Sequence, residues 1–587
     1  MVQALFEEGL LRRNGTLRLA RPLSAVKVPA TVQAVIASRI DRLAAAEKEL
    51  LQTLAVLGHE FALNLVQRVT LKSSDELGQM LAQLQLGEFI YEQPAVGAIE
   101  YSFKHALTQE VAYNSVLAER RRAIHERTGL AIEALYTPQL EDHYSGLAHH
   151  YLHGNDAVKA LRYAQLAAEQ AVSRGLYTEA SSLIETALNL LEKVPEGNER
   201  LRAELVLRSI ESTVAFVLYG ASSLERERAI RRMCELGERI GEVDQLLRGL
   251  IALCNLYFVR GEPVRGLELA KRCFELAEST HDPALLAEAH YGAGLLAWSC
   301  GKLREAVANF EDAMRYSDRT NRTFLLFGIL YRSVIACDSA LALQLLGRVG
   351  EAVKAAEEGL RRARESKHLF SLGLALTLVG GMLPCYRREP EIVRAHAEEA
   401  IALSEENGFA QWLPWGRFHH GWALFEFGQV TEGLAKMEAG IAGFQRLGGV
   451  SRQQHLIALR AEAIARIGRV DEALTILNET LAHIGRSGDK AEHAEMLRLK
   501  GEVLLMGDRS ATPEAEKCFR EALEVALAQE AKWWELRTTV SLARLLRDTN
   551  RRDEARTMLA EVYSWFTEGF DLSDLKDAKA LLDQLSA

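Results

Sequence analysis

The chain has 587 residues, far more than one hydrophobic core usually serves, so it must fold as several domains or as a repeat array. Apolar residues make up 48% and charged residues 26% of the chain, which excludes disordered and collagen-like classes. The formal net charge of −10 is small for this length and argues against a nucleic-acid partner, which would require clustered lysines and arginines.

The start of the chain and its cysteines predict a cytoplasmic protein. The opening residues, MVQALFEEGLLRRNG, carry Glu7 and Glu8 where an export signal needs an apolar core. The seven cysteines are scattered singly, with no CxxC pair that could supply two thiolates to one metal or form a disulfide. We therefore expect buried free thiols in a reducing compartment, and no membrane partner.

Residues 29–140 predict a small domain of three helices, a β-hairpin and a further helix. The stretches ATVQAVIASRIDRLAAAEKELLQTLAVLG and SSDELGQMLAQLQLGEFIYEQ have apolar residues at helical spacing, and the second runs into a short strand. Ile90-Tyr91 and Ile99–Phe103 flank Pro94 and Gly97, which predicts the hairpin. This order of elements is a winged-helix plan.

Three blocks of this domain resemble the winged-helix segment of bacterial STAND-type signalling ATPases, which are often fused to a class III adenylate or guanylate cyclase. The blocks are PATVQAVIASRIDRL (29–43), LLQTLAVLGHEF (50–61) and YSFKHALTQEVAYNSVLAERRRAIH (101–125), followed by LAHHY at 147–151. The resemblance implies an upstream NTPase module, of which residues 1–28 are a remnant or linker. Because the chain has no G-x-x-x-x-G-K-[ST] motif and no cyclase domain, we expect neither ATP hydrolysis nor a cofactor.

Two features of this domain are candidate contact sites. His105 begins the helix after the hairpin, and the resemblance implies a nucleotide sensor that reaches a bound diphosphate; a structural histidine is the alternative. Arg120–Arg122 form a basic run between Glu119 and Glu126, which favours a solvated face or a dock for the ATPase over a DNA contact.

A run of histidines follows in EDHYSGLAHHYLHGND. His149 and His153 are four residues apart on one helical face, but His150 stands where the H-E-x-x-H motif of zinc proteases needs glutamate. We therefore favour helix packing for these histidines and His143, and predict no metal site.

Residues 141–587 carry a repeat with a period near 40 residues. A turn residue is followed by small or apolar residues at offsets of five, nine and twelve, in copies that begin at Gly175, Gly261, Gly301, Gly347, Gly428, Gly468 and Asn550. The double intervals of 81 and 82 residues after Gly347 and Gly468 contain degenerate copies, with Val393, Ala397 and Ala400 in the first and Ala515, Phe519 and Ala522 in the second.

These offsets lie on one face of an α-helix, where small side chains let a second helix approach closely. The turn glycine can cap the preceding helix in a left-handed conformation. Such a helical pair is too small to bury its apolar face alone, so stacking is required. The small residues and the turns of GRVDEAL and GKLREAV resemble the tetratricopeptide (TPR) family, with its usual 34-residue period lengthened. The sequence thus predicts an all-α, TPR-like superhelix of about ten pairs, preceded by the winged-helix-like domain.

Residues Leu369–Cys385 form the longest uncharged stretch and approach the length of a membrane span. Gly380, Gly381 and Pro384 interrupt it, and it is in phase with the repeats. We interpret it as a buried repeat helix.

Aromatic residues concentrate in WLPWGRFHHGWALFEFG, with three of the seven tryptophans in eleven residues. Because aromatic anchors concentrate at binding surfaces, they are candidate partner contacts, although gap filling between repeats is the alternative. The candidates are Trp412, Trp415, Phe418, Trp422, Trp533 and Trp534.

The sequence therefore predicts a non-catalytic signalling scaffold that binds a protein or peptide on the concave face of the repeats. One alternative is a part of a STAND ATPase or cyclase system, with an upstream NTPase or cyclase module as its partner. A transcription regulator is the other, although the acidic tail FDLSDLKDAKALLDQLSA leaves no room for a DNA-reading domain.

Overall fold

The computed structural model describes residues 11–14, 16–19, 32–93, 99–319, 325–326, 329–448 and 451–586. The predicted turn residues Pro94 and Gly97, and most of the predicted linker 1–28, lie outside these ranges. The chain divides into two compact units, Met1–Ala203 (unit 1) and Glu204–Ala587 (unit 2), and each is described by itself.

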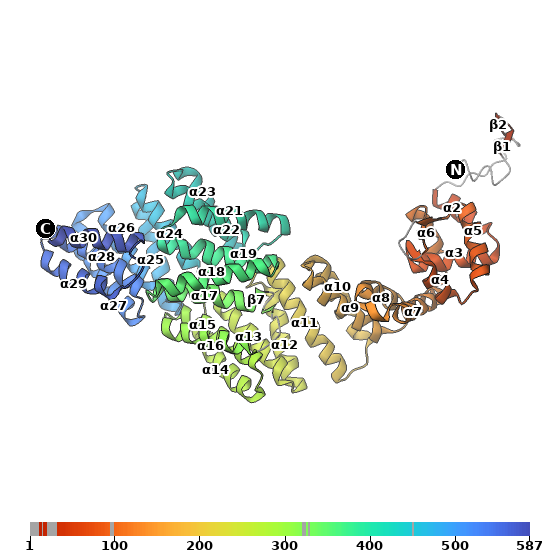
Figure 1. Ribbon diagram of the computed structural model, residues 1–587, viewed down its shortest axis with the longest axis horizontal. Helices are drawn as coiled ribbons and strands as arrows, with labels where there is room; N and C mark the ends of the chain where they lie inside the picture. The colour runs from red at the N-terminus through yellow and green to blue at the C-terminus, as the bar shows by residue number, and fades with distance from the viewer. Residues whose placement is uncertain are drawn as a thin grey trace. The chain divides into compact units, whose positions relative to one another are not determined.

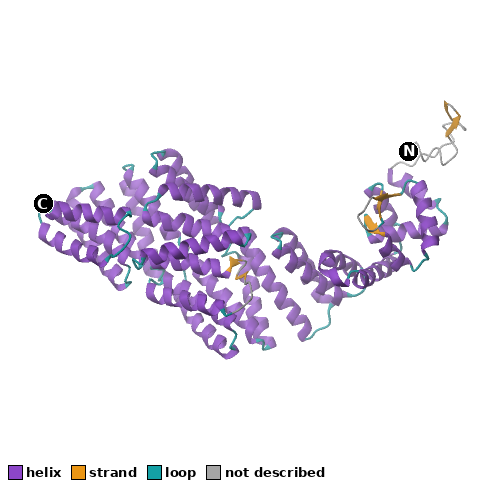
Figure 2. Ribbon diagram, viewed as in Figure 1, coloured by secondary structure: helices purple, strands orange, loops and turns teal. Residues whose placement is uncertain are grey.

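Unit 1 begins with helices around a small antiparallel sheet (Figure 2). Strands β4 (Ile90–Gln93) and β5 (Glu100–Phe103) form the predicted hairpin, with Ile90 opposite Phe103. A third strand, β3 (Glu60–Ala62), joins the other edge of β5, giving the order β3-β5-β4. The prediction lacked β3 because three residues between two helices show no alternation of apolar and polar side chains.

The other described part of unit 1, from Val32 onwards, is mainly helical. Four helices precede the hairpin within residues 32–93, one more than predicted, because residues 63–70, to which the sequence analysis assigned no element, form a helix of their own. The helices are α2 (Val32–Asp41), α3 (Ala45–Leu57), α4 (Leu63–Thr70), α5 (Ser74–Leu86), α6 (Ala106–Asn114), α7 (Ala118–Leu135), η2 (Thr137–His143), α8 (Tyr144–His153), α9 (Ala157–Ser173), α10 (Tyr177–Leu190) and η3 (Leu191–Lys193). Strands β1 (Leu11–Asn14) and β2 (Thr16–Leu19) pair with each other.

Unit 2 is a superhelix of TPR-like helical pairs, as predicted (Figure 1). The pairs are α13 (Val243–Val259) with α14 (Pro263–Thr280), α15 (Pro283–Ser299) with α16 (Leu303–Asp318), α17 (Tyr331–Leu345) with α18 (Val349–Glu365), α22 (Leu413–Glu426) with α23 (Val430–Arg446), α24 (Gln453–Arg466) with α25 (Val470–Ser487), α26 (His493–Gly507) with α27 (Thr512–Ala528), and α28 (Lys532–Asp548) with α29 (Arg552–Trp565). Helix α30 (Ser573–Ser586) covers the last pair, and short elements β6 (Leu325–Leu326), β7 (Ile329–Leu330) and η5 (Arg509–Ala511) lie in connections.

The predicted stripe of small residues is the face that each second helix turns to its partner. Of the stripe residues, all but the half-buried Ala356 are buried, and both degenerate copies form helices, α21 (Pro390–Asn407) and α27. On α23, a Cβ on Gly433 would lie 2.7 Å from the Gly421 carbonyl oxygen, so only glycine permits this crossing. The six turn glycines of the repeat all have positive φ, and Arg388 and Asn550 adopt the same conformation in their copies.

The pattern missed one pair, α11 (Asn198–Tyr219) and α12 (Leu224–Ile240). The interval from Gly175 to Gly261 is also double, but α11 and α12 do not approach each other as closely as the other pairs, and the buried face of α12 includes Met233 and Leu236. An ion pair of Arg232 with Glu204, at 2.8 Å, links the two helices.

Successive turns of the superhelix contact one another. The Ala221 amide donates to the Gln411 side chain, and the Gly350 amide donates to Glu568, across 190 and 218 residues of chain. The first helices of the pairs are consequently buried on almost every side, whereas the second helices are buried along one stripe. This arrangement places the first helix of each pair on the inner face of the superhelix.

The first helix of one inner pair is irregular. It runs as α19 (Leu369–Thr377), a π-helical turn η4 (Leu378–Met382) and α20 (Leu383–Arg387). Among the described residues, Leu369–Arg387 is the one helix long and apolar enough to cross a membrane, and 89% of its apolar window is buried inside the protein. The predicted buried repeat helix is therefore confirmed.

Candidate functional site

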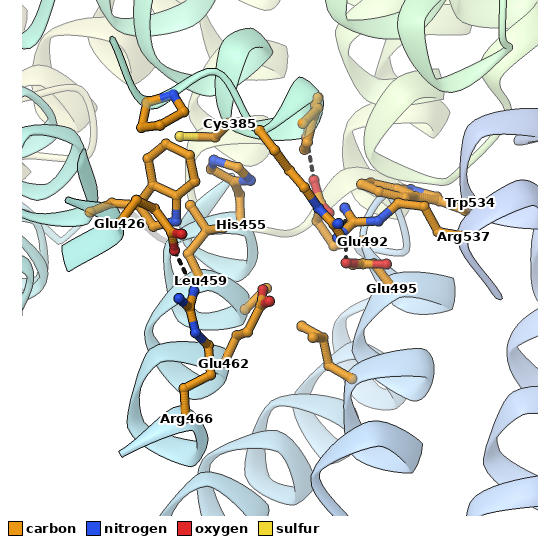
Figure 3. Close-up of a pocket in the computed structure, with 16 residues that line it drawn as sticks. Cys385, Glu426, His455, Leu459, Glu462, Arg466, Glu492, Glu495, Trp534 and Arg537 are labelled. Carbon is orange, nitrogen blue, oxygen red and sulfur yellow. Dashed lines mark hydrogen bonds and ion pairs between the residues drawn. The ribbon is translucent and has the colours of Figure 1, made fainter. Parts of the chain in front are cut away.

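A pocket of about 260 Å³, here called the inner pocket, lies on the inner face of unit 2 (Figure 3). Nearly all of its lining comes from the first helices of consecutive pairs: α20, α22, α24, α26 and α28. The lining residues are Cys385, Tyr386, Arg388, Pro390, Trp422, Glu426, His455, Ala458, Leu459, Glu462, Arg466, Glu492, Glu495, Leu499, Trp534 and Arg537.

One side of the inner pocket is closed by Glu426 of α22 and Arg466 of α24, which form an ion pair (Figure 3). The Arg466 guanidinium also lies 4.8 Å from the centre of the Phe425 ring. Both groups are thus held by contacts within the wall.

The opposite side carries a buried charge network. The Glu495 carboxylate contacts Arg498 at 2.7 Å and Arg537 at 3.1 Å, and Arg537 lies 3.8 Å from Asp574 of α30. Burial alone would raise the pKa of Glu495, but the two arginines outweigh burial and lower it. Glu495 is therefore ionised at neutral pH.

Glu492 differs from its neighbour Glu495. Tyr386 donates a hydrogen bond to Glu492 Oε1, whereas Glu492 Oε2 is buried and has no hydrogen-bond partner among the described residues. Burial raises the pKa of Glu492 to about 8. The indole Nε1 of Trp534, another lining residue, is also buried and lacks an acceptor in the described part of the chain. The inner pocket thus has two buried polar atoms in its lining without a partner among the described residues.

Glu462 lies between the two sides (Figure 3). Its side chain is half-buried, and no ion pair within 4 Å joins it to a described residue, although Arg388 and Arg498 lie near enough to interact with its charge. The lining therefore offers one carboxylate for a cationic group of a ligand.

Cys385 and His455 lie next to each other in the wall of the inner pocket (Figure 3), and His419 of α22 lies close to both. One ligand atom from each of the three side chains lies within 4.8 Å of the others. Burial lowers the pKa of His419 to about 3, lowers that of His455 and raises that of the Cys385 thiol. All three groups are consequently neutral.

A second, more apolar pocket of about 90 Å³ lies elsewhere in unit 2. Trp412 and Trp415 line it, together with the buried ion pair of Arg452 and Asp338. The guanidinium of Arg452 also lies 5.0 Å from the centre of the Trp298 ring. This pocket is smaller than the inner pocket and less polar.

The structure buries every aromatic residue that the sequence suggested for partner contact. Trp422 and Trp534 line the inner pocket, and Trp412 and Trp415 line the second pocket. Phe418 packs against Gly440, and Trp533 donates from its indole to the Tyr386 carbonyl at 3.3 Å. All six thus fill space between helices, and four of them also face a pocket.

In unit 1, His105 is exposed at the start of α6, as the resemblance requires of a nucleotide contact. Its carbonyl oxygen accepts the amide of Thr108. Among the basic residues, Arg120 pairs with Glu49 at 2.5 Å. The nucleotide-sensor role of His105 stays a prediction.

Three of the four histidines of the run in unit 1 gather around His125 of α7. His125 and His150 approach through their Nδ1 atoms at 3.0 Å, and Tyr113 contacts His125 Nε2 at 3.0 Å. Burial and the neighbouring histidines lower the pKa of His125 and of His150 to about 3. His149 and His153 are exposed, so this cluster opens to solvent on one side.

The sequence analysis gave no role to Cys385, His419 or His455. Their spacing of 34 and 36 residues is close to the repeat period, which places them on equivalent helices of three consecutive pairs. A search for ligand-type residues one repeat apart would have found them.

No known protein-family model matches the chain. A protein of Rhizobium meliloti (strain 1021), described as uncharacterised, is 21% identical over 523 residues. That match covers 88% of this chain and 50% of the relative, so the chain spans about half the length of the curated relative it matches.

Solved helical-repeat structures are similar at low identity. A Rap protein complexed with competence and sporulation factor is 13% identical, with a TM-score of 0.48 over 63% of this chain and 98% of that chain. A STAND protein with a tetratricopeptide repeat sensor from Pyrococcus horikoshii is 13% identical, with a TM-score of 0.35 over 87% of this chain and 68% of that chain. The apo quorum sensor NprR from B. thuringiensis is 11% identical, with a TM-score of 0.39 over 62% and 99%. The arrangement of the helices themselves identifies the TPR-like superhelix.

Proposed function

We propose that this protein is a non-catalytic scaffold that holds a short peptide, or an extended segment of a partner protein, in the inner pocket. The observation that carries the proposal is the pair of buried polar atoms in the lining that have no partner among the described residues, Trp534 Nε1 and Glu492 Oε2. A peptide unit has one carbonyl acceptor and one N–H donor, so a bound main chain can satisfy both.

The size of the inner pocket supports a short segment. Its volume of about 260 Å³ lies just below the range of roughly 300–1,000 Å³ of small-molecule sites. One or two residues of a peptide fit such a volume.

The charges of the lining support a basic residue in that segment. Glu426 and Glu495 are paired with arginines of the wall, so Glu462 is the carboxylate left for a ligand among the described lining residues. We propose that Glu462 pairs with a lysine or arginine side chain, or with the amino terminus, of the peptide.

Selection of peptides on the full chain tests this function. A displayed library of short peptides is selected against wild-type protein, and the dissociation constant of the best binder is measured by titration. Leu459→Trp fills the half-buried centre of the pocket and should weaken binding at least about tenfold, which corresponds to 1.4 kcal/mol. Ile392→Trp, on the exposed side of α21, is the matched control and should bind as wild type does. Equal binding by the two variants would refute the site.

The charge preference has its own test. Glu462→Gln keeps the shape of the side chain and removes its charge, so it should weaken a peptide with a basic residue by about tenfold, which is 1.4 kcal/mol. The same substitution should leave unchanged the binding of a peptide whose basic residue is replaced by glutamine. If both peptides responded alike, Glu462 would not be the partner of the basic group.

The finer assignment to a bacterial STAND signalling system, in the cytoplasm, rests on the three sequence blocks of residues 29–140. We propose that this winged-helix-like domain docks on an NTPase module, that residues 1–28 connect to it, and that residues 141–587 act as the sensor. The exposed position of His105 supports a nucleotide contact. If the isolated chain bound ADP and His105→Ala abolished that binding, the sensor role would be supported; unchanged ADP binding would refute it.

A further inference from the structure

Three consecutive inner helices each place one metal-ligating side chain at the same point. Cys385 comes from α20, His419 from α22 and His455 from α24, and all three are almost completely buried. A sulfur or nitrogen atom from each lies within 4.8 Å of the other two. Because the helices belong to stacked pairs, the backbone holds the three groups together without any contribution from loops.

Two of these groups have unsatisfied atoms. The Nε2 atoms of His419 and His455 are buried, and neither has a hydrogen-bond partner among the described residues. Leaving a buried polar atom without a partner is energetically unfavourable. Two such atoms beside one thiol are readily explained if a cation binds between them.

The backbone next to the cluster is shaped around the His419 ring. A Cβ at position 381 would lie 2.2 Å from His419 Nδ1, so any residue other than glycine would displace the imidazole. Gly381 belongs to the π-helical turn η4, which directly precedes α20 and Cys385. Single π-helical turns inside α-helices are frequent at functional sites.

The chemistry of the donor set points to one class of metal. Two imidazoles and a thiolate are ligands of zinc and of other thiophilic metals, whereas calcium and magnesium require oxygen ligands. Tetrahedral zinc with bonds of about 2.0–2.3 Å separates its ligand atoms by roughly 3.3–3.7 Å. The three side chains would therefore have to close by about 1 Å, which rotations of the side chains can supply.

We propose that Cys385, His419 and His455 bind one zinc ion, with the fourth coordination position open to the inner pocket. Cys385 and His455 line this pocket, and so does Glu426. On binding, the Cys385 thiol gives up its proton to solvent, so the bound thiolate leaves a net charge of +1 beside Glu426. This metal site goes beyond peptide binding and is tested without any peptide.

Titration of the chelator-treated full chain with Co²⁺ tests the proposal, because a cobalt thiolate bond has a charge-transfer absorption band that cobalt bound only by histidines lacks. The expected result is one equivalent of Co²⁺ with this band, displaced by Zn²⁺. Cys385→Ser should abolish the band, whereas Cys337→Ser, at another buried thiol, should keep it. His455→Gln should weaken zinc binding by at least about a hundredfold, the upper end of the loss caused when only a hydrogen-bond partner of a ligand is removed.

The wild-type titration decides the question even if a variant fails to fold. No bound Co²⁺, or bound Co²⁺ without the charge-transfer band, would overturn the proposal. The second outcome would assign the metal to the His125, His149 and His153 group in unit 1, which contains no thiol. As a check on folding, Zn²⁺ should raise the thermal midpoint of wild type but not that of Cys385→Ser.

Discussion

Ser222 donates a hydrogen bond from its hydroxyl to the main-chain carbonyl of Leu447 over 2.6 Å, although 225 residues of chain separate them. Ser222 precedes α12 and Leu447 follows α23, so the bond joins one turn of the superhelix to the next. Similar contacts join Ser299 to Lys490 and Gly350 to Glu568. The inner pocket is therefore enclosed by a wall whose turns support each other.

A comparison of two glycines tests the contribution of these contacts. Gly301 and Gly468 have positive φ angles of 76° and 86°, so alanine strains the backbone at both, by about 1 kcal/mol. A Cβ at Gly301 would also lie 2.4 Å from Gln529 Nε2, which donates to the Lys490 carbonyl, whereas at Gly468 no described atom lies within 4 Å. Gly301→Ala should therefore lower the free energy of unfolding by about 1 kcal/mol more than Gly468→Ala does, measured by urea denaturation. Equal losses would show that contacts between turns contribute little.

The second pocket depends on the buried pair of Asp338 and Arg452. Asp338 also accepts a hydrogen bond from Tyr291 at 2.8 Å. Asp338→Ala leaves the Arg452 charge buried without its partner, so it should destabilise the protein by about 3–5 kcal/mol. The double variant Asp338→Leu with Arg452→Met should recover most of this loss in urea denaturation. A loss below about 1 kcal/mol for the single variant would show that solvent reaches Arg452.

The histidine cluster of unit 1 makes stability depend on pH. His125 and His150 have a pKa of about 3 in the folded protein, below the value near 6.5 of an unfolded histidine. Between these values the unfolded chain binds more protons, so the stabilisation is complete above pH 6.5 and is lost as the pH falls towards 3. His149, His153 and Arg121 face His125 and disfavour its charged form in the same direction.

Amide hydrogen exchange of α7 and α8 at pH 7 and pH 5, corrected for intrinsic rates, measures this effect. Protection should fall at pH 5 by the equivalent of about 2 kcal/mol for each histidine. The double variant His125→Gln with His150→Gln should show a smaller difference between the two pH values. The same difference in wild type and variant would place the origin of the pH dependence elsewhere.

The repeat was predictable because its physical cause is local. Small or apolar residues recur at fixed offsets in every copy, so even the copies at Arg388 and Ser510 were recognised from Val393 and Ala515 onwards. Helices α11 and α12 were missed because they do not approach each other as closely as the other pairs, so small residues at these offsets are not required. Strand β3 was missed because its pairing with β5 depends on contacts that are distant in the sequence.

The pocket could not be predicted to the same extent. Aromatic clustering led to Trp422 and Trp534, which line the inner pocket, but also to Phe418 and Trp533, which pack in the core. A binding aromatic and a packing aromatic look alike in sequence, since the difference lies in which helix face meets the cavity. No sequence pattern marks Glu462, because whether its carboxylate has an ion-pair partner depends on the three-dimensional arrangement of the helices.

The most direct test of the central claim, that the inner pocket holds a peptide, is photo-cross-linking with a selected peptide that carries a photoreactive group. Mass spectrometry of the cross-linked full chain identifies the residues that the peptide touches. The account predicts cross-links on α24, α26 and α28 at lining residues such as Leu459, Leu499 and Trp534, and their loss in Leu459→Trp. Cross-links confined to the second helices of the pairs, and unchanged in that variant, would contradict it.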